Sequence, residues 1–163
     1  MGSAEAVGST VDFLAGDWTV VRRISDHRIG QVGSFRGEAS FQPCGPPPAA
    51  VASLGGLVLA YHEHGELRFG AHRGPASRSL LYRDLPDGSA DVRFPDGREF
   101  YRLDLRWGSW SAQHPCRDDQ YLVTATWLGP DSFAETWRAE GPAKHYELAT
   151  TYTRVRGDSG ARP

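Results

Sequence analysis

The fold of this chain is constrained above all by a succession of short segments in which apolar and polar residues alternate. Phe35, Ala39 and Phe41, for example, share one face of a segment whose opposite face is polar. A period of two is typical of β-strands that bury one face. Pro-Asp-Gly sequences at 86–88 and 95–97 mark turns, because proline fixes φ and glycine tolerates positive φ. The predicted strands are 18–24, 35–41, 57–63, 66–72, 78–83, 90–94, 98–106, 119–127, 132–138 and 144–155.

The same pattern predicts a single all-β domain, which suits a chain of 163 residues. One helical turn at 10–15 precedes the first strand, and no segment is long enough for the crossover helix of a βαβ unit. Such a meander must either close into a barrel or stack as two sheets, because open edge strands invite aggregation. The length of the chain and the even spacing of the strands favour the barrel. We therefore expect an antiparallel up-and-down β-barrel of about 8–10 strands over residues 1–156, with a short N-terminal helical turn. Residues 44–56 are expected to be an irregular connection, and 157–163 a disordered tail.

Composition and charge argue against several classes of partner. The formal net charge of −2 and the pI near 6.3 do not favour binding to nucleic acid or to an anionic membrane. No apolar run approaches the roughly 20 residues of a spanning helix, and the N-terminus lacks the features of a secretion signal. We therefore expect a cytoplasmic protein, and a homodimer is left open. In that compartment Cys44 and Cys116 are expected to be reduced thiols rather than a disulfide.

Short motifs occur at the two ends of the predicted barrel. Gly16-Asp17-Trp18 opens the first strand, and Arg154 lies near the end of the last strand, in phase with Tyr152. A buried guanidinium needs a partner, which an indole face and backbone carbonyls would supply. This arrangement resembles the calycin superfamily (lipocalins and fatty-acid-binding proteins), in which a basic residue packs over the tryptophan of a Gly-x-Trp motif. The resemblance implies that Trp18 and Arg154 close one end of the barrel.

The middle of the chain carries a second resemblance. Residues 92–98, 114–121 and 137–144 are similar to an uncharacterised family of bacterial lipocalin-like proteins, and the similarity extends from about Phe13 to Arg154. That family implies no settled activity. The second lipocalin motif, Thr-Asp-Tyr, does not occur in this sequence, which departs from the pattern of transport lipocalins.

Acidic residues in phase with aromatic residues are the main functional candidates. Glu135 lies between Phe133 and Trp137, on the face that the alternation marks as the inner one. Burial between two aromatic side chains would raise the pKa of this carboxyl group and suit it to proton exchange with a substrate. The alternative is a structural pair between Glu135 and an arginine. We predict that Glu135 is a catalytic acid or base.

Three further catalytic candidates lie near the predicted rim of the barrel. Asp119 and Tyr121 share a phase with Val123 and Trp127, and His114 lies on the preceding connection. Tyr121 or His114 could donate a hydrogen bond to a developing oxyanion. The alternative is that His114, Asp119 and Tyr121 only hold a turn through local hydrogen bonds.

Aromatic and acidic residues of the inner face are expected to line a binding cavity, because a small barrel is either filled by side chains or holds a ligand. Glu63, like Glu99, has the alternative of being solvated or paired with an arginine. Metal and haem are not expected: His62, His64 and His72 lack convincing ligand spacing, and His145 is predicted to point outward. The predicted substrate-binding residues are Tyr61, Glu63, Tyr101, Phe133, Trp127 and Trp137.

These observations favour an enzyme that needs no cofactor and acts by general acid/base catalysis on a small hydrophobic aromatic metabolite. The resemblance to lipocalin-like bacterial barrels, which host cyclases, isomerases and decarboxylases, implies a biosynthetic cyclisation of the Pictet–Spengler or cycloaddition type, or an isomerisation. Two alternatives remain open. The same cavity could serve a carrier of a lipophilic small molecule, or the barrel could be structural, with a filled interior.

Overall fold

The computed structural model describes residues 6–157, and in this range the chain forms ten strands and two short helices. Of the predicted tail, all residues except Gly157 lie outside the described range. The elements are α1 (Thr10–Leu14), β1 (Gly16–Asp26), β2 (Gln31–Pro43), α2 (Ala49–Ala52), β3 (Val58–Phe69), β4 (His72–Asp84), β5 (Ala90–Arg93), β6 (Glu99–Leu103), β7 (Ser109–Cys116), β8 (Asp119–Gly129), β9 (Ser132–Gly141) and β10 (Lys144–Arg154).

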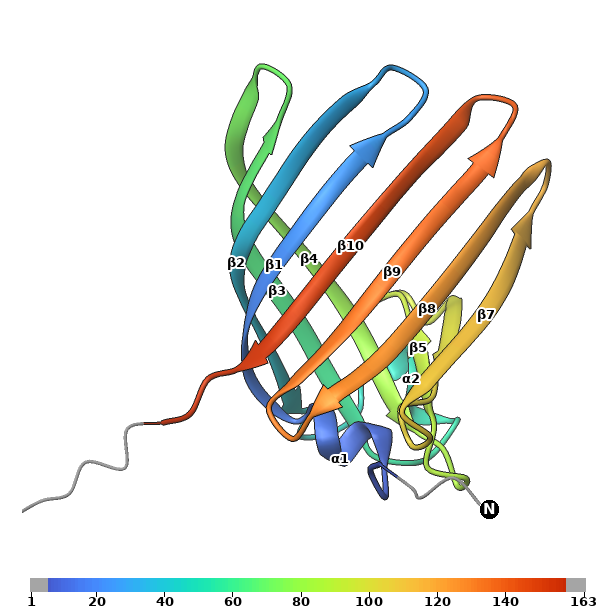
Figure 1. Ribbon diagram of the computed structural model, residues 1–163. Helices are drawn as coiled ribbons and strands as arrows, with labels where there is room; N and C mark the ends of the chain where they lie inside the picture. The colour runs from blue at the N-terminus through green and yellow to red at the C-terminus, as the bar shows by residue number, and fades with distance from the viewer. Residues whose placement is uncertain (1–5, 158–163) are drawn as a thin grey trace, which may run out of the picture.

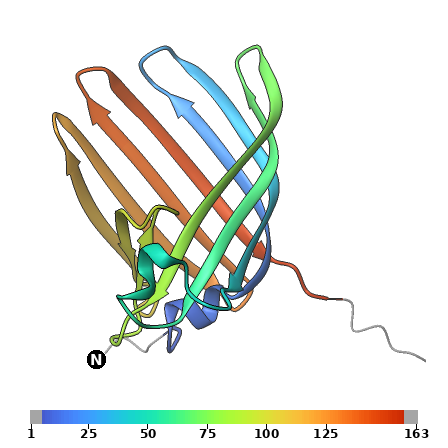
Figure 2. The same cartoon turned by 180° about the vertical axis from the view of Figure 1, so that it is seen from behind.

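The strands form one antiparallel sheet that curls into a nearly closed barrel (Figures 1 and 2). The order is β6-β5-β4-β3-β2-β1-β10-β9-β8-β7, so the first and last long strands pair with each other, Trp18 opposite Arg154. β6 and β7 stand at the two ends of this order. The prediction of an all-β up-and-down barrel with an N-terminal helical turn is confirmed.

One end of the barrel is closed by α1 and a cation–aromatic contact. Trp18 is fully buried and donates a hydrogen bond from Nε1 to the carbonyl oxygen of Leu14 (2.8 Å). The guanidinium carbon of Arg154 lies 4.2 Å from the centroid of the Trp18 ring. Its terminal nitrogens donate to the carbonyl oxygens of Ala15 (3.0 Å) and Phe13 (2.6 Å). Arg154 thus covers the indole and satisfies the carbonyls of the helical turn.

The hydrophobic core fills this closed end. Phe133 stacks on Tyr152 with ring centroids 4.3 Å apart and meets Trp18 edge to face at 5.1 Å. Phe41 packs against Tyr61 at 4.7 Å in the same cluster. The long hairpins terminate at the opposite end of the barrel, away from α1 (Figure 1).

Three elements differ from the predictions. The segments 57–63 and 66–72, predicted as separate strands, belong largely to the continuous strand β3, and α2 lies in the stretch expected to be irregular. β7 was not predicted, and His114 therefore lies in a strand rather than on a connection. Gly65 reads as a break in sequence, but in the barrel it faces Gly37 of β2, where the two backbones approach closely.

Candidate functional site

The open end of the barrel contains an apolar pocket of about 320 Å³. Ile24 of β1, Leu67 of β3 and Tyr146 of β10 project into it, and all three follow the phase of buried residues of their strands. Side chains of three different strands meet there because barrel closure brings the inner faces of β1, β3 and β10 together. The full lining is Ile24, Asp26, Leu67, Phe69, His72 and Tyr146.

A buried ion pair lies on the inner face below this pocket. Arg22, next inward from Ile24 along β1, donates from both terminal nitrogens to the two carboxylate oxygens of Glu63, at 2.8 and 2.9 Å. Its Nε donates to the hydroxyl of Thr150 (2.8 Å). Burial acts to raise the pKa of Glu63, but Arg22 and Arg78 outweigh burial and hold this pKa below its ordinary value. Glu63 is therefore an ionised, neutralised carboxylate.

Tyrosine hydroxyls surround the ion pair. Tyr61 donates to Glu63 (2.5 Å), and its oxygen lies 3.3 Å from that of Tyr152. Burial raises the pKa of each of these hydroxyls, and a nearby carboxylate adds to the shift, so they stay protonated and available as donors. The tyrosines with raised pKa inside the barrel are Tyr61, Tyr82, Tyr101 and Tyr152.

Glu135 is buried without a cationic partner among the described residues. Its side chain accepts hydrogen bonds from the hydroxyl of Tyr101 (2.9 Å) and from Nε1 of Trp137 (2.6 Å). Within the part of the chain that the structure describes, no ion pair includes Glu135. Thr150 lies between Glu135 and Arg22 in the register of β9, β10 and β1. The predicted alternative of an arginine pair is therefore wrong for Glu135, whereas it describes Glu63.

Flat aromatic faces lie beside Glu135. Phe100 stacks on Phe94 with centroids 4.5 Å apart and an interplanar angle of 10°. Phe100 also lies 5.0 Å from the ring of Trp137, which meets Tyr101 edge to face at 4.8 Å. Trp137 and Tyr101 are half-buried. Such surfaces suit a planar aromatic molecule.

The other three predicted catalytic residues lie toward the open end. Lys144 contacts Asp119 (3.1 Å) and donates to the hydroxyl of Tyr121 (2.9 Å). His114 is opposite Tyr121 in the β7–β8 ladder and is exposed. Glu135 is opposite Ala125, farther along β8, so the structure does not place Asp119 beside it. Lys144 thus joins Asp119 and Tyr121 at the rim, and His114 is the ladder neighbour of Tyr121.

Two predicted binding residues belong to the closed end instead. Phe133 is only 2% exposed and is packed into the core against Trp18 and Tyr152. Trp127 is half-buried and opposite Phe133, and its indole nitrogen has no hydrogen-bond partner among the described residues. The other four predicted binding residues form hydrogen bonds with one another or with Glu135 on the inner face. They are Tyr61, Glu63, Tyr101 and Trp137.

Three inner residues were not predicted, namely Arg22, Arg78 and Thr150. The sequence contained a signal for Arg22, because this residue is in phase with the inward residues Trp18 and Val20. Glu135 was predicted to be an inner residue by the same criterion. Arg78 and Glu63 are directly opposite each other in the β3–β4 ladder, with Arg78 Nε 3.2 Å from Oε1. A pair between Glu63 and an arginine was one of the predicted alternatives, but the sequence did not indicate which arginines would be the partners.

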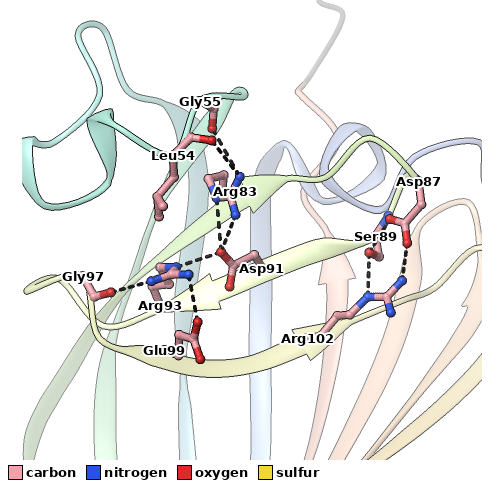
Figure 3. Close-up of polar contacts among 10 residues, drawn as sticks. All are labelled: Leu54, Gly55, Arg83, Asp87, Ser89, Asp91, Arg93, Gly97, Glu99 and Arg102. Atoms are coloured by element: carbon pink, nitrogen blue, oxygen red, sulfur yellow. Dashed lines mark hydrogen bonds and ion pairs between the residues drawn. The ribbon is translucent and has the colours of Figure 1, made fainter.

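A second group of arginines lies on the outer face of β4, β5 and β6 (Figure 3). Arg83 and Arg93 both bind Oδ2 of Asp91, at 2.9 and 2.7 Å. Arg83 also donates to the carbonyl oxygens of Leu54 and Gly55, which ties β4 to the segment after α2. Arg102 bridges Ser89 and Asp87. Each guanidinium is used in joining neighbouring segments, which is a structural role.

Comparison with solved structures shows the fold. A phycobiliprotein lyase, CPES of Guillardia theta, has a TM-score of 0.57 at 8% identity, with 90% of this chain and 91% of that chain covered. A redesigned β-barrel, mFAP1, bound to DFHBI has a TM-score of 0.42 at 16% identity, covering 88% and 97%. A fluorescence-activating β-barrel designed de novo has a TM-score of 0.46 at 12% identity, covering 91% and 100%.

Within residues 6–157 no helix has the length and apolar character to cross a bilayer. No curated protein matches the chain. One family model matches residues 14–154, nearly the whole barrel from the end of α1 to the end of β10. The chain therefore belongs to the family of unknown function DUF6314.

Proposed function

We propose that this protein binds a small, planar aromatic molecule inside the open end of its barrel. The observation that carries the proposal is the apolar pocket of about 320 Å³, whose lining strands continue inward to hydrogen-bonding groups. Binding sites of this kind combine apolar walls with a few placed polar groups. Half-buried Trp137 and Tyr101 supply ring faces, and Thr150 and the tyrosines supply polar contacts.

A pair of neighbouring substitutions tests this location. Ala76 is on the inner face of β4, and Ser77 is on its outer face. Ala76→Phe should fill the space below the pocket and weaken binding of the neutral fluorescent probe N-phenylnaphthylamine by at least about tenfold. Ser77→Phe adds the same bulk outside and should leave the fluorescence titration unchanged. Equal binding by both variants, each with a native circular dichroism spectrum, would contradict a site inside the barrel.

A second candidate function is proton transfer by Glu135, and it is favoured by the neutral partners of this carboxylate. Glu63 is neutralised by arginine, whereas Glu135 receives only hydrogen bonds from Tyr101 and Trp137 among the described residues. Each carboxylate oxygen retains a lone pair, so Glu135 can still accept a proton. Together with orientation of a bound ring, this chemistry would serve an isomerisation or a cyclisation. A carrier would need no such group.

A model base-catalysed reaction tests Glu135 without knowledge of the natural substrate. In the elimination of a nitrobenzisoxazole, a base removes the carbon-bound proton, the N–O bond breaks and a cyanophenolate forms, which is measured by absorbance. We expect Glu135→Gln to lower the rate by about 100-fold or more. Asp119→Asn, at the rim, should retain the wild-type rate. A wild-type rate no higher than that of Glu135→Gln would favour the carrier.

A further inference from the structure

Arg78 differs from the other arginines of the inner face in having no hydrogen bond to any described residue. It lies on β4 among inward residues, and its guanidinium carbon is 5.8 Å from the centroid of the Tyr61 ring. Its side chain is 35% exposed although it points into the barrel. Nε is buried without a hydrogen-bond partner, and the terminal nitrogens donate to none of the described residues. A guanidinium has five N–H donors, so most of the hydrogen-bonding capacity of Arg78 is not used within the described chain.

The outer arginines show how this chain ordinarily uses a half-buried guanidinium (Figure 3). Arg93 donates from all three nitrogens, to Asp91, Gly97 and Glu99. Arg83 likewise uses every nitrogen. Only Nε of Arg78 is a buried donor without a hydrogen bond, whereas the terminal nitrogens belong to a side chain that is 35% exposed. These terminal nitrogens are therefore open to a partner from outside the chain.

Glu63 forms an ion pair with Arg78 but accepts no hydrogen bond from it. Arg22 already occupies both of its oxygens with a two-bond fork, and Tyr61 donates to one of them as well. Arg78 Nε lies 3.2 Å from Oε1, but this ion pair lacks hydrogen-bond geometry. Two cations therefore share one anion, and the cluster of Arg22, Glu63 and Arg78 carries one surplus positive charge.

Small residues lie between Arg78 and the pocket along β3 and β4. Along β3 and β4, the pair next to Glu63 and Arg78 in the direction of the open end is Gly65 and Ala76. Leu67, a wall of the apolar pocket, follows on β3. The absence of bulk at Gly65 and Ala76 allows a molecule seated against Leu67 to reach inward to the guanidinium.

We infer that Arg78 binds an oxyanion of the aromatic ligand, so that the protein selects aromatic acids, carboxylates above all, over their neutral counterparts. The inference rests on the proposed binding function and specifies the ligand class. The planar fork of arginine matches the two oxygens of a carboxylate, and charge-assisted hydrogen bonds gain strength away from bulk water. The acid group then points inward, and the ring remains among the apolar residues of the open end.

Two probes with the same aromatic framework test the inference. Anilinonaphthalene sulfonate carries an oxyanion, and N-phenylnaphthylamine lacks it. In fluorescence titrations, Arg78→Met should weaken sulfonate binding by about 10- to 100-fold and leave binding of the neutral probe unchanged. Arg78→Lys, which keeps the charge, should recover part of the affinity. The control Arg73→Met removes an exposed charge from the same strand and should change neither titration.

The outcomes separate this inference from the proposed function. If wild-type protein binds neither probe, or if Ala76→Phe leaves both titrations intact, the binding site itself is misplaced. If both probes bind and their affinity ratio is the same in wild type and Arg78→Met, the role of Arg78 is overturned although the binding function stands. Should Arg78→Met fail to fold, NMR of wild-type protein decides. The Arg78 Nε–H signal should then shift with the sulfonate alone, and an unmoved signal rejects the inference.

Discussion

Replacing Glu63 by Gln should destabilise the protein by about 3–5 kcal/mol, the usual consequence of removing one member of a buried ion pair. Glu63 and Arg22 are 3% and 11% exposed, so the substitution leaves Arg22 charged and without its carboxylate in the barrel. Arg78 adds less, because its 35% exposure allows partial screening by solvent. The free energy of unfolding in urea measures the loss. The control Glu38→Gln, on the outer face and 74% exposed, should change stability by less than about 0.5 kcal/mol.

Acid should reproduce part of this loss in the wild type. Because the folded-state pKa of Glu63 is lowered, its contribution is fully present above the unfolded-state value of 4.5 and disappears as pH falls through the folded-state pKa. Glu63→Gln has no such group and should lose less stability over that acidic range. Parallel stability curves for the two proteins below the unfolded-state pKa would show that Glu63 is not an ionised partner of Arg22.

Substitution of Gly65 by Ala should prevent a native barrel or cost at least about 3 kcal/mol, at the upper end of overpacking effects. A Cβ at position 65 would overlap the carbonyl oxygen of Arg36 and lie 2.6 Å from the Cα of Gly37. These are backbone atoms of a paired strand, so no side-chain rotation relieves the contact.

A nearby glycine provides the matched control. A Cβ on Gly74, in β4, would meet only the imidazole of His72 at 3.6 Å, an ordinary van der Waals distance. Gly74→Ala should therefore express and unfold like the wild type in thermal denaturation followed by circular dichroism. If Gly65→Ala were equally stable, β2 and β3 would have to be farther apart at this point than the structure shows.

Alternation predicted the barrel well because burial of one strand face is a local property of sequence. The alternation placed Glu135 and Trp137 on the inner face, where Trp137 donates a hydrogen bond to Glu135. It missed β7, where Trp110 is the only large apolar inward residue, Ala112 and His114 are small or polar, and Pro115 interrupts the pattern. That composition is tolerated because β7 is an edge strand, and edge strands need fewer buried apolar contacts and fewer ladder bonds.

The sequence by itself determined which side chains of each strand turn inward, because pleat geometry alternates faces whatever the neighbouring strands are. Only the tertiary structure decided which inward groups meet. Arg22 of β1 binds Glu63 of β3, Arg78 is left without a hydrogen bond to the described chain, and Glu135 is held by Tyr101 of β6 rather than by an arginine. These partners come from strands distant in the chain, and their meeting depends on the tilt, stagger and radius of the closed barrel, which no local pattern specifies.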